Sequence, residues 1–243
     1  MKSATVKGKY IAGLILLLLV IDQAFKIYIK TNYHLGEEHQ VLGDWFRLHF
    51  VENEGMAWGL QFGGSFGKIA LTLFRLVAVI WGTFYIRGLV RKGAGRGFII
   101  CVSLIYAGAA GNLIDSMFYG LIFDASYLGS HHVASFLPEG GGYASFLHGR
   151  VVDMLYFPMI DTVLPDWVPV WGGKEFTFFD PVFNLADFYI SFSFFMLLIF
   201  QRRFFPDLKE DKKSEDKDGL HSGSESPKEA DAPSLHSSTT AVQ

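Results

Sequence analysis

Two aspartates carry a carboxylate into apolar surroundings without an adjacent cation to balance it. Asp153 lies in the segment VVDMLYFPM, and Asp187 lies in FNLADFYI, just ahead of an apolar run. A carboxylate close to lipid is costly and usually has a function. Two carboxylates held together at low dielectric share one proton, so the pair can activate a water and protonate a leaving amine. These residues suggest peptide-bond hydrolysis without a metal, if the fold brings them together, which their spacing in sequence does not decide.

Several smaller polar clusters accompany the two aspartates. A spacing of three or four residues places both members of a pair on one helix face. A purely structural role, such as an ion pair or a cap, is the simplest explanation of Asp22 with Lys26 and of Asn112 with Asp115, whereas for Asn53 a turn residue and a ligand contact are equally good explanations. The clusters are Asp22 with Lys26, Asn112 with Asp115, Asn184 with Asp187, and Asn53 with Gly55 in the turn sequence ENEG.

Four apolar segments must position these clusters. Half of the residues are hydrophobic, with 24 phenylalanines among the 243, a composition typical of a small membrane protein. Each segment is close to the ~20 residues that a helix needs to cross a bilayer. In the fourth, Asp180 and Pro181 fit the N-cap and the first helical position. The predicted spans are residues 10–29, 69–86, 98–117 and 182–200.

Lysine and arginine residues predict the orientation of these spans. They gather before the first span, between the second and third, and after the fourth, whereas the long loops 31–67 and 118–180 contain few. The positive-inside rule then places both termini in the cytoplasm and the long loops outside. Alternating residues 45–51 predict a half-buried strand, and residues 56–62 a second one. We therefore expect an all-α integral membrane protein, with four transmembrane helices and a small β-sheet on the outer, periplasmic side.

The rest of the composition limits partners and cofactors. Residues 1–206 are expected to form one membrane domain, and the polar residues 207–243 a disordered cytoplasmic tail. A net charge of −3 gives no basic field for nucleic acid, and the single Cys101 excludes an intrachain disulfide. Nothing indicates a cofactor or an oligomer, so we expect a monomer that needs no cofactor.

Two alternative functions are weighed against hydrolysis by carboxylates. A metal peptidase could use His131, His132 and His148, although no HExxH motif is present. A proton-coupled transporter or channel could use the carboxylates, but these gather at the outer edge and do not line the spans.

Five short motifs occur in an order that resembles one known family. They are DQAFK at 22–26, NEGMAW at 53–58, GNLID at 111–115, GRVVD at 149–153 and FNLAD at 183–187. In this order they resemble the blocks of the bacterial lipoprotein signal peptidases, or signal peptidase II, over about residues 10–203. The resemblance implies an intramembrane aspartic endopeptidase of the bacterial inner membrane, with its active site facing the periplasm. Such enzymes remove signal peptides from prolipoproteins by cutting before a diacylglyceryl-modified cysteine, so lipid-modified precursors and membrane lipid are the implied partners.

The resemblance also implies a role for individual residues. Asp153 and Asp187 would form the catalytic pair. The residues that would contact substrate or support the site are Asn53, Gly55, Asn112, Asn184, Asp22, Lys26 and Asp115.

Two features depart from the family pattern. Ser116 follows Asp115 where the family usually has an arginine, and Arg150 is a candidate to neutralise Asp115 in its place. The stretches on either side of Asp153 are also longer than usual, so an added lid or surface segment is expected.

Overall fold

A computed structural model describes residues 6–54, 64–167, 169–178 and 180–204. The chain divides into two units, Met1–Phe204 and Phe205–Gln243. The predicted tail, residues 207–243, and the predicted second strand at residues 56–62 lie outside the described residues.

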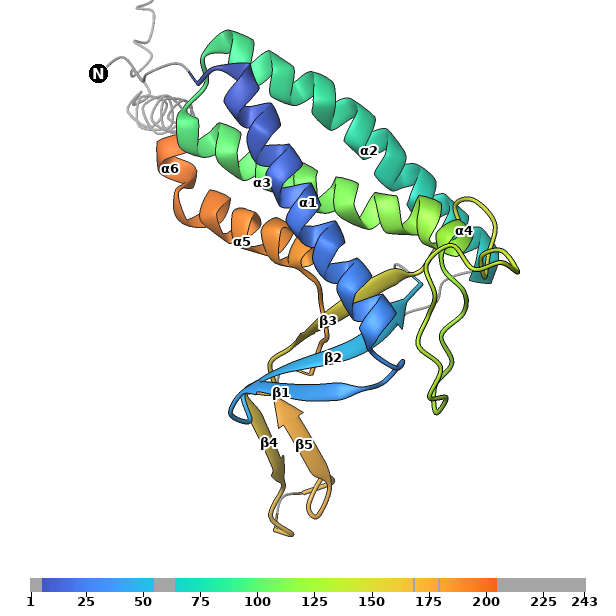
Figure 1. The fold of residues 1–243 in the computed structure, drawn as a ribbon. Helices are drawn as coiled ribbons and strands as arrows, with labels where there is room; N and C mark the ends of the chain where they lie inside the picture. Colours follow the sequence, from blue (N-terminus) through green and yellow to red (C-terminus); the bar gives the residue numbers. More distant parts are fainter. Residues whose placement is uncertain (1–5, 55–63, 168, 179, 205–243) are drawn as a thin grey trace, which may run out of the picture. The chain divides into compact units, whose positions relative to one another are not determined.

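Helices form the larger part of the described residues (Figure 1). Three helical stretches are long and apolar enough to cross a membrane, namely Gly8–Asn32, Phe66–Arg91 and Arg96–Ile122. The helices are α1 (Gly8–Asn32), α2 (Gly64–Lys92), α3 (Arg96–Ile114), the π-helical turn η2 (Asp115–Tyr119), α4 (Gly120–Ile122), α5 (Leu185–Ile199) and α6 (Gln201–Phe204).

The fourth predicted span begins later than expected. Its N-cap is Asn184, whose side chain accepts a hydrogen bond from the Asp187 amide, so the prediction of a cap at Asp180 was wrong. The chain before Asn184 is held extended, because Phe183 pairs with Leu155 in an isolated β-bridge. The 15 residues of α5 rise about 22 Å, which is less than the ~30 Å hydrocarbon core of a bilayer.

Helix α3 lies at the centre of the bundle and packs against α1, α2 and α5. Two glycines allow this close approach, as small residues do between membrane helices. A Cβ atom at Gly108 would lie 2.3 Å from the Ala186 carbonyl oxygen of α5, and one at Gly111 would lie 2.6 Å from Asp22 Oδ2 of α1. The small residues of α3 thus allow the start of α5 to approach Asp22 of α1.

A three-stranded antiparallel sheet lies at one end of the bundle (Figure 1). Strand β2 (Phe46–Asn53) confirms the strand predicted at residues 45–51. Its two neighbours in the sheet, β1 (Glu38–Leu42) and β3 (Val151–Tyr156), were not predicted. Apolar side chains of the sheet pack with the end of α1 and with η2 in a buried cluster that contains Ile29, Phe50, Tyr119 and Met154. The strands are β1 (Glu38–Leu42), β2 (Phe46–Asn53) and β3 (Val151–Tyr156), with a separate hairpin of β4 (Ile160–Val163) and β5 (Glu175–Phe178).

The long loop between α4 and β3 folds back onto the end of the third membrane helix. The Ala144 amide donates to the Gly120 carbonyl at 2.8 Å, and the Gly149 amide donates to the Ser116 carbonyl at 2.9 Å. Gly149 lies so close that a Cβ atom there would be 2.1 Å from the Asp115 carbonyl oxygen. The insertion therefore leads directly into β3 and delivers Asp153 to the end of the bundle.

Candidate active site

Asp153 lies in the middle of β3, where the register pairs it with Val51 of β2. Its side chain is only 2% exposed. Asn184 Nδ2 donates to Asp153 Oδ1 at 2.6 Å, and Asn53 Nδ2 donates to Asp153 Oδ2 at 3.2 Å. The buried carboxyl group is thus held by amide donors from two other elements, α5 and the end of β2.

Asp187 occupies the first turn of α5, where a carboxylate is favoured by the helix dipole. It is half-buried. Asn112 Nδ2 donates to Asp187 Oδ1 at 2.7 Å. The Asp187 amide donates to Asn184 Oδ1 at 2.9 Å, so the helix cap also fixes the position of this aspartate.

The two aspartates belong to one hydrogen-bonded group. Asn184 Nδ2 also donates to Asn112 Oδ1 at 3.1 Å, which completes a chain from Asp153 through both asparagines to Asp187. Burial, and after it the negative charge of Asp187, raise the pKa of Asp153 to about 7. Near neutral pH the pair therefore tends to hold one proton, as closely placed carboxylates do.

Lys26 supports this group from α1. Its fully buried ammonium lies 2.8 Å from Asp115 Oδ2 and 3.1 Å from Asp22 Oδ2, and it donates to Asn112 Oδ1 at 2.9 Å. Gln23, which sequence reasoning left without a role, adds hydrogen bonds from Nε2 to both carboxylates. Buried charges need such complete pairing, since an unpaired one would be very costly.

The same buried cluster holds the two elements that carry the paired aspartates. Asp22 Oδ1 accepts a hydrogen bond at 3.0 Å from the Ala186 amide in the first turn of α5. Asp115 Oδ2 accepts one at 3.4 Å from the Val152 amide of β3. The supporting carboxylates thus set the positions of both the strand and the helix.

Arg150 does not take the part expected of it. Its guanidinium donates from Nε to Glu54 at 3.0 Å and from Nη1 to Glu52 at 3.1 Å. The charge of Asp115 is balanced instead by Lys26, so the prediction that Arg150 neutralises Asp115 was wrong. The reason is that Asp115 is buried against α1 beneath the sheet, while Arg150 precedes β3 and faces acidic residues at the end of β2.

A different arginine, Arg75 of α2, reaches the site and was missed at the sequence level. Its Nη1 donates to Ser116 Oγ at 3.4 Å, and its charge interacts with those of Asp187, Asp115 and Asp153. The signal was present, because an arginine inside an apolar span marks a functional position by default.

Two further predictions concern Gly55 and the histidines considered as metal ligands. Gly55 lies outside the described residues. Of the histidines considered as metal ligands, His132 pairs with Asp124 at 2.9 Å and His148 contacts Ser145 at 3.1 Å. Across the described part of the chain, no three His, Cys, Asp or Glu side chains are grouped to hold a metal.

Comparisons with known proteins identify the family of this chain. The lipoprotein signal peptidase of Porphyromonas gingivalis strain W83 is 50% identical over 210 residues, covering 86% of this chain and 89% of the relative. That of Amoebophilus asiaticus is 40% identical over 178 residues, covering 72% and 70%. A solved bacterial membrane enzyme shares the fold, with a TM-score of 0.51 at 20% identity over 84% of this chain and 93% of that one.

The matching relatives are named as peptidases, which gives the transporter alternative no support. The family model described as signal peptidase (SPase) II matches residues 14–203, which include both aspartates of the group and every residue that supports them. The chain therefore belongs to the signal peptidase II family and is a peptidase.

Proposed function

We propose that this chain is an aspartic endopeptidase that removes signal peptides from bacterial prolipoproteins, cutting before a diacylglyceryl-modified cysteine. The observation that carries the proposal is the hydrogen-bonded group that joins Asp153 of β3 to Asp187 of α5 through Asn184 and Asn112. The names of the relatives, lipoprotein signal peptidase, support the choice of substrate.

The proposed chemistry follows from a carboxyl pair that holds one proton. The ionised member takes a proton from a water, which attacks the scissile carbonyl carbon, while the protonated member donates to the carbonyl oxygen. The carboxyl group that is now protonated then donates to the leaving amine as the C–N bond breaks, and the other takes a proton from a hydroxyl of the gem-diol intermediate, so that the pair again holds one proton. Asn184 and Asn53 donate to the two oxygens of Asp153, and Asn112 donates to one oxygen of Asp187. A carboxylate has about four lone-pair sites, so lone pairs on both groups remain for water and substrate.

In the same proposal, the side chain of Asn53 contacts the peptide substrate. Asn53 is the last residue of β2, at the point where the strand meets Asp153. The buried cluster of Asp22, Lys26 and Asp115 acts indirectly, by holding α5 and β3 in position. Arg150 stabilises the end of β2 through its bonds to Glu52 and Glu54. Gly55 belongs to the same turn in sequence and is proposed to line the site on the basis of the resemblance alone.

The proposed membrane setting places this site at the outer edge of the bacterial inner membrane. Helices α5 and α6 together, residues 185–204, would form the fourth span, with both termini in the cytoplasm and the sheet on the periplasmic side. Large apolar side chains such as Leu16, Phe74 and Phe84 are more than 60% exposed and would face lipid. A site at this edge suits a substrate whose lipid chains enter sideways from the bilayer. The chain is proposed to act as a monomer.

The test is cleavage of a lipid-modified prolipoprotein by the purified full chain in detergent, followed by the mobility of the product on a gel. Asp153→Asn and Asp187→Asn should each lower the rate at least about 100-fold, because each removes one half of the acid–base pair. Asp44→Asn is the matched control, since Asp44 is exposed in the turn between β1 and β2. Wild-type cleavage by either site variant would remove the assignment of the pair.

A further inference from the structure

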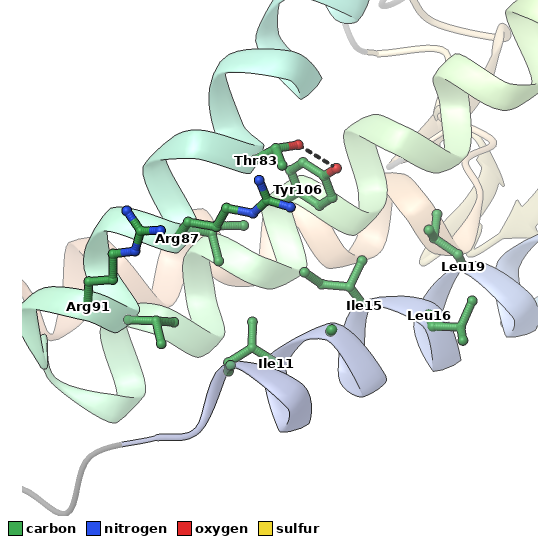
Figure 2. Close-up of a pocket in the computed structure, with 12 residues that line it drawn as sticks. Ile11, Ile15, Leu16, Leu19, Thr83, Arg87, Arg91 and Tyr106 are labelled. Carbon is green, nitrogen blue, oxygen red and sulfur yellow. Dashed lines mark hydrogen bonds between the residues drawn. The ribbon is translucent and has the colours of Figure 1, made fainter.

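A groove opens between α1, α2 and α3 (Figure 2). It lies at the end of the bundle away from the sheet, where α1 begins (Figure 1). Its volume of about 560 Å³ is in the range of sites that hold a small ligand. Most of its wall is aliphatic. The lining includes Ile11, Ile15, Leu16 and Leu19 from α1, and Ile86 and Val90 from α2.

Two arginines, Arg87 and Arg91, line the same groove one helical turn apart on α2. Figure 2 shows Arg87 turned toward the hydroxyl groups of Thr83 and Tyr106, which lie 2.9 Å from each other. Neither arginine forms an ion pair within the described ranges. Like charges at this spacing repel each other, so an anion between them would be stabilising.

The surrounding sequence offers these arginines no acidic partner nearby. There is no aspartate or glutamate between Glu54 and Asp115, which covers the whole of α2 and α3, and none before Asp22 in α1. The three helices that form the groove therefore present only cations at this end. The missing counter-charge points to a ligand that supplies it.

We propose that this groove binds one anionic phospholipid, with an acyl chain along the aliphatic wall and the phosphate at Arg87 and Arg91. The guanidinium group suits this role because its planar donors match phosphate oxygens in pairs. The proposal rests on the orientation given above, in which this end faces the cytoplasmic leaflet, where anionic lipids gather.

Net charge distinguishes an anionic phospholipid from two competing ligands of this groove. The apolar part of a signal peptide would fit an aliphatic groove, but its amino-terminal region is positively charged and would meet two arginines. A zwitterionic lipid offers the same acyl chain without the net negative charge. The groove should therefore prefer an anionic lipid over both.

The experiment measures lipid retained by the purified full chain with native mass spectrometry, and thermal unfolding in neutral detergent. Phosphatidylglycerol and phosphatidylcholine with identical acyl chains are compared, with inorganic phosphate as a separate arm. Phosphatidylglycerol should be retained at least tenfold more than phosphatidylcholine and should raise the unfolding temperature, as a ligand of the folded state does.

Variants assign the binding to this groove. Arg87→Ala with Arg91→Ala should abolish the preference for phosphatidylglycerol, whereas Arg202→Ala with Arg203→Ala, two exposed arginines of α6, should keep it. Ala12→Trp should block the acyl chain while leaving both arginines in place.

Three outcomes would overturn the proposal. The first is equal retention of both lipids, and the second is an unchanged preference in the Arg87 and Arg91 double variant. The third is displacement of the lipid by inorganic phosphate or by a signal peptide at equal concentration, which would assign the groove to that ligand instead. Because the readout is lipid binding, failure of the peptidase proposal would leave this result intact.

Discussion

Replacing Asn184 by serine should move the alkaline limit of activity upward. Asn184 caps α5 through its Oδ1, and its Nδ2 donates to Asp153 and to Asn112. Serine is also a good N-cap, but its shorter side chain cannot reach Asp153. The substitution therefore removes the donor to the carboxylate while it keeps the start of the helix.

The direction of the shift follows from the hydrogen bond. Donation from Asn184 stabilises the ionised form of Asp153, so losing it raises the pKa of Asp153 further above 7. Asp153 is 2% exposed, so water screens this interaction little. A hydrogen bond to a charged group contributes about 1.5–3 kcal/mol, and at about 1.36 kcal/mol per unit the pKa should rise by roughly one to two units.

The assay is the pH dependence of kcat/KM, which reports the essential groups of the free enzyme. The proposed mechanism requires one proton on the pair, so wild-type activity should fall as pH rises through about 7. For Asn184→Ser the fall should begin at least about one unit higher, at a lower maximal rate. Asn32→Ser is the control, because Asn32 is exposed at the end of α1 and, among the residues that the structure describes, its side chain bonds only to Tyr28 and Thr31. A folded Asn184→Ser enzyme with an unmoved or lowered alkaline limit would refute the reasoning.

Three further predictions concern stability and the residues around the pair. Because the pKa of Asp153 is raised from 3.8 to about 7, the folded state loses stability as pH rises through that window. At pH 8 the free energy of unfolding of Asp153→Asn should therefore exceed that of wild type by up to about 4 kcal/mol, and the difference should vanish near pH 4. Arg75→Gln should lower kcat at least about tenfold and move the alkaline limit of activity to higher pH, because a cation near the carboxylates is lost. Arg75→Lys keeps the charge and should keep more activity. A Gln variant with the wild-type pH profile would contradict this. Gly108→Ala places a Cβ atom 2.3 Å from the Ala186 carbonyl oxygen, so it should lower both activity and unfolding temperature. Gly88→Ala is the control, because a Cβ atom there has nothing within 4 Å and should change neither quantity. Equal behaviour of the two variants would count against the packing argument.

Local patterns in the sequence already predicted much of this protein. Length and apolar composition located three membrane helices to within a few residues at most ends, because hydrophobicity over ~20 residues is a local property. Alternation located β2 in the same way. Spacing of three or four residues correctly placed Asp22 with Lys26, whose side chains lie 3.1 Å apart.

What the tertiary structure decided is how distant segments meet. Asp153 comes to the site because β3 pairs with β2 across a hundred residues, and Asn184 caps α5 because Phe183 is held beside Leu155. Neither contact leaves a periodic trace in the sequence, so the cap was predicted four residues too early.

The choice of ionic partners was likewise beyond the reach of sequence. Asp115 could have been neutralised by any cation that the fold delivered, and the fold delivers Lys26 from α1 while Arg150 turns to Glu52 and Glu54. Residue types and short spacings therefore determined which groups are available for chemistry. Helix packing and strand register decided which of them touch, because those contacts depend on the positions of whole elements in space.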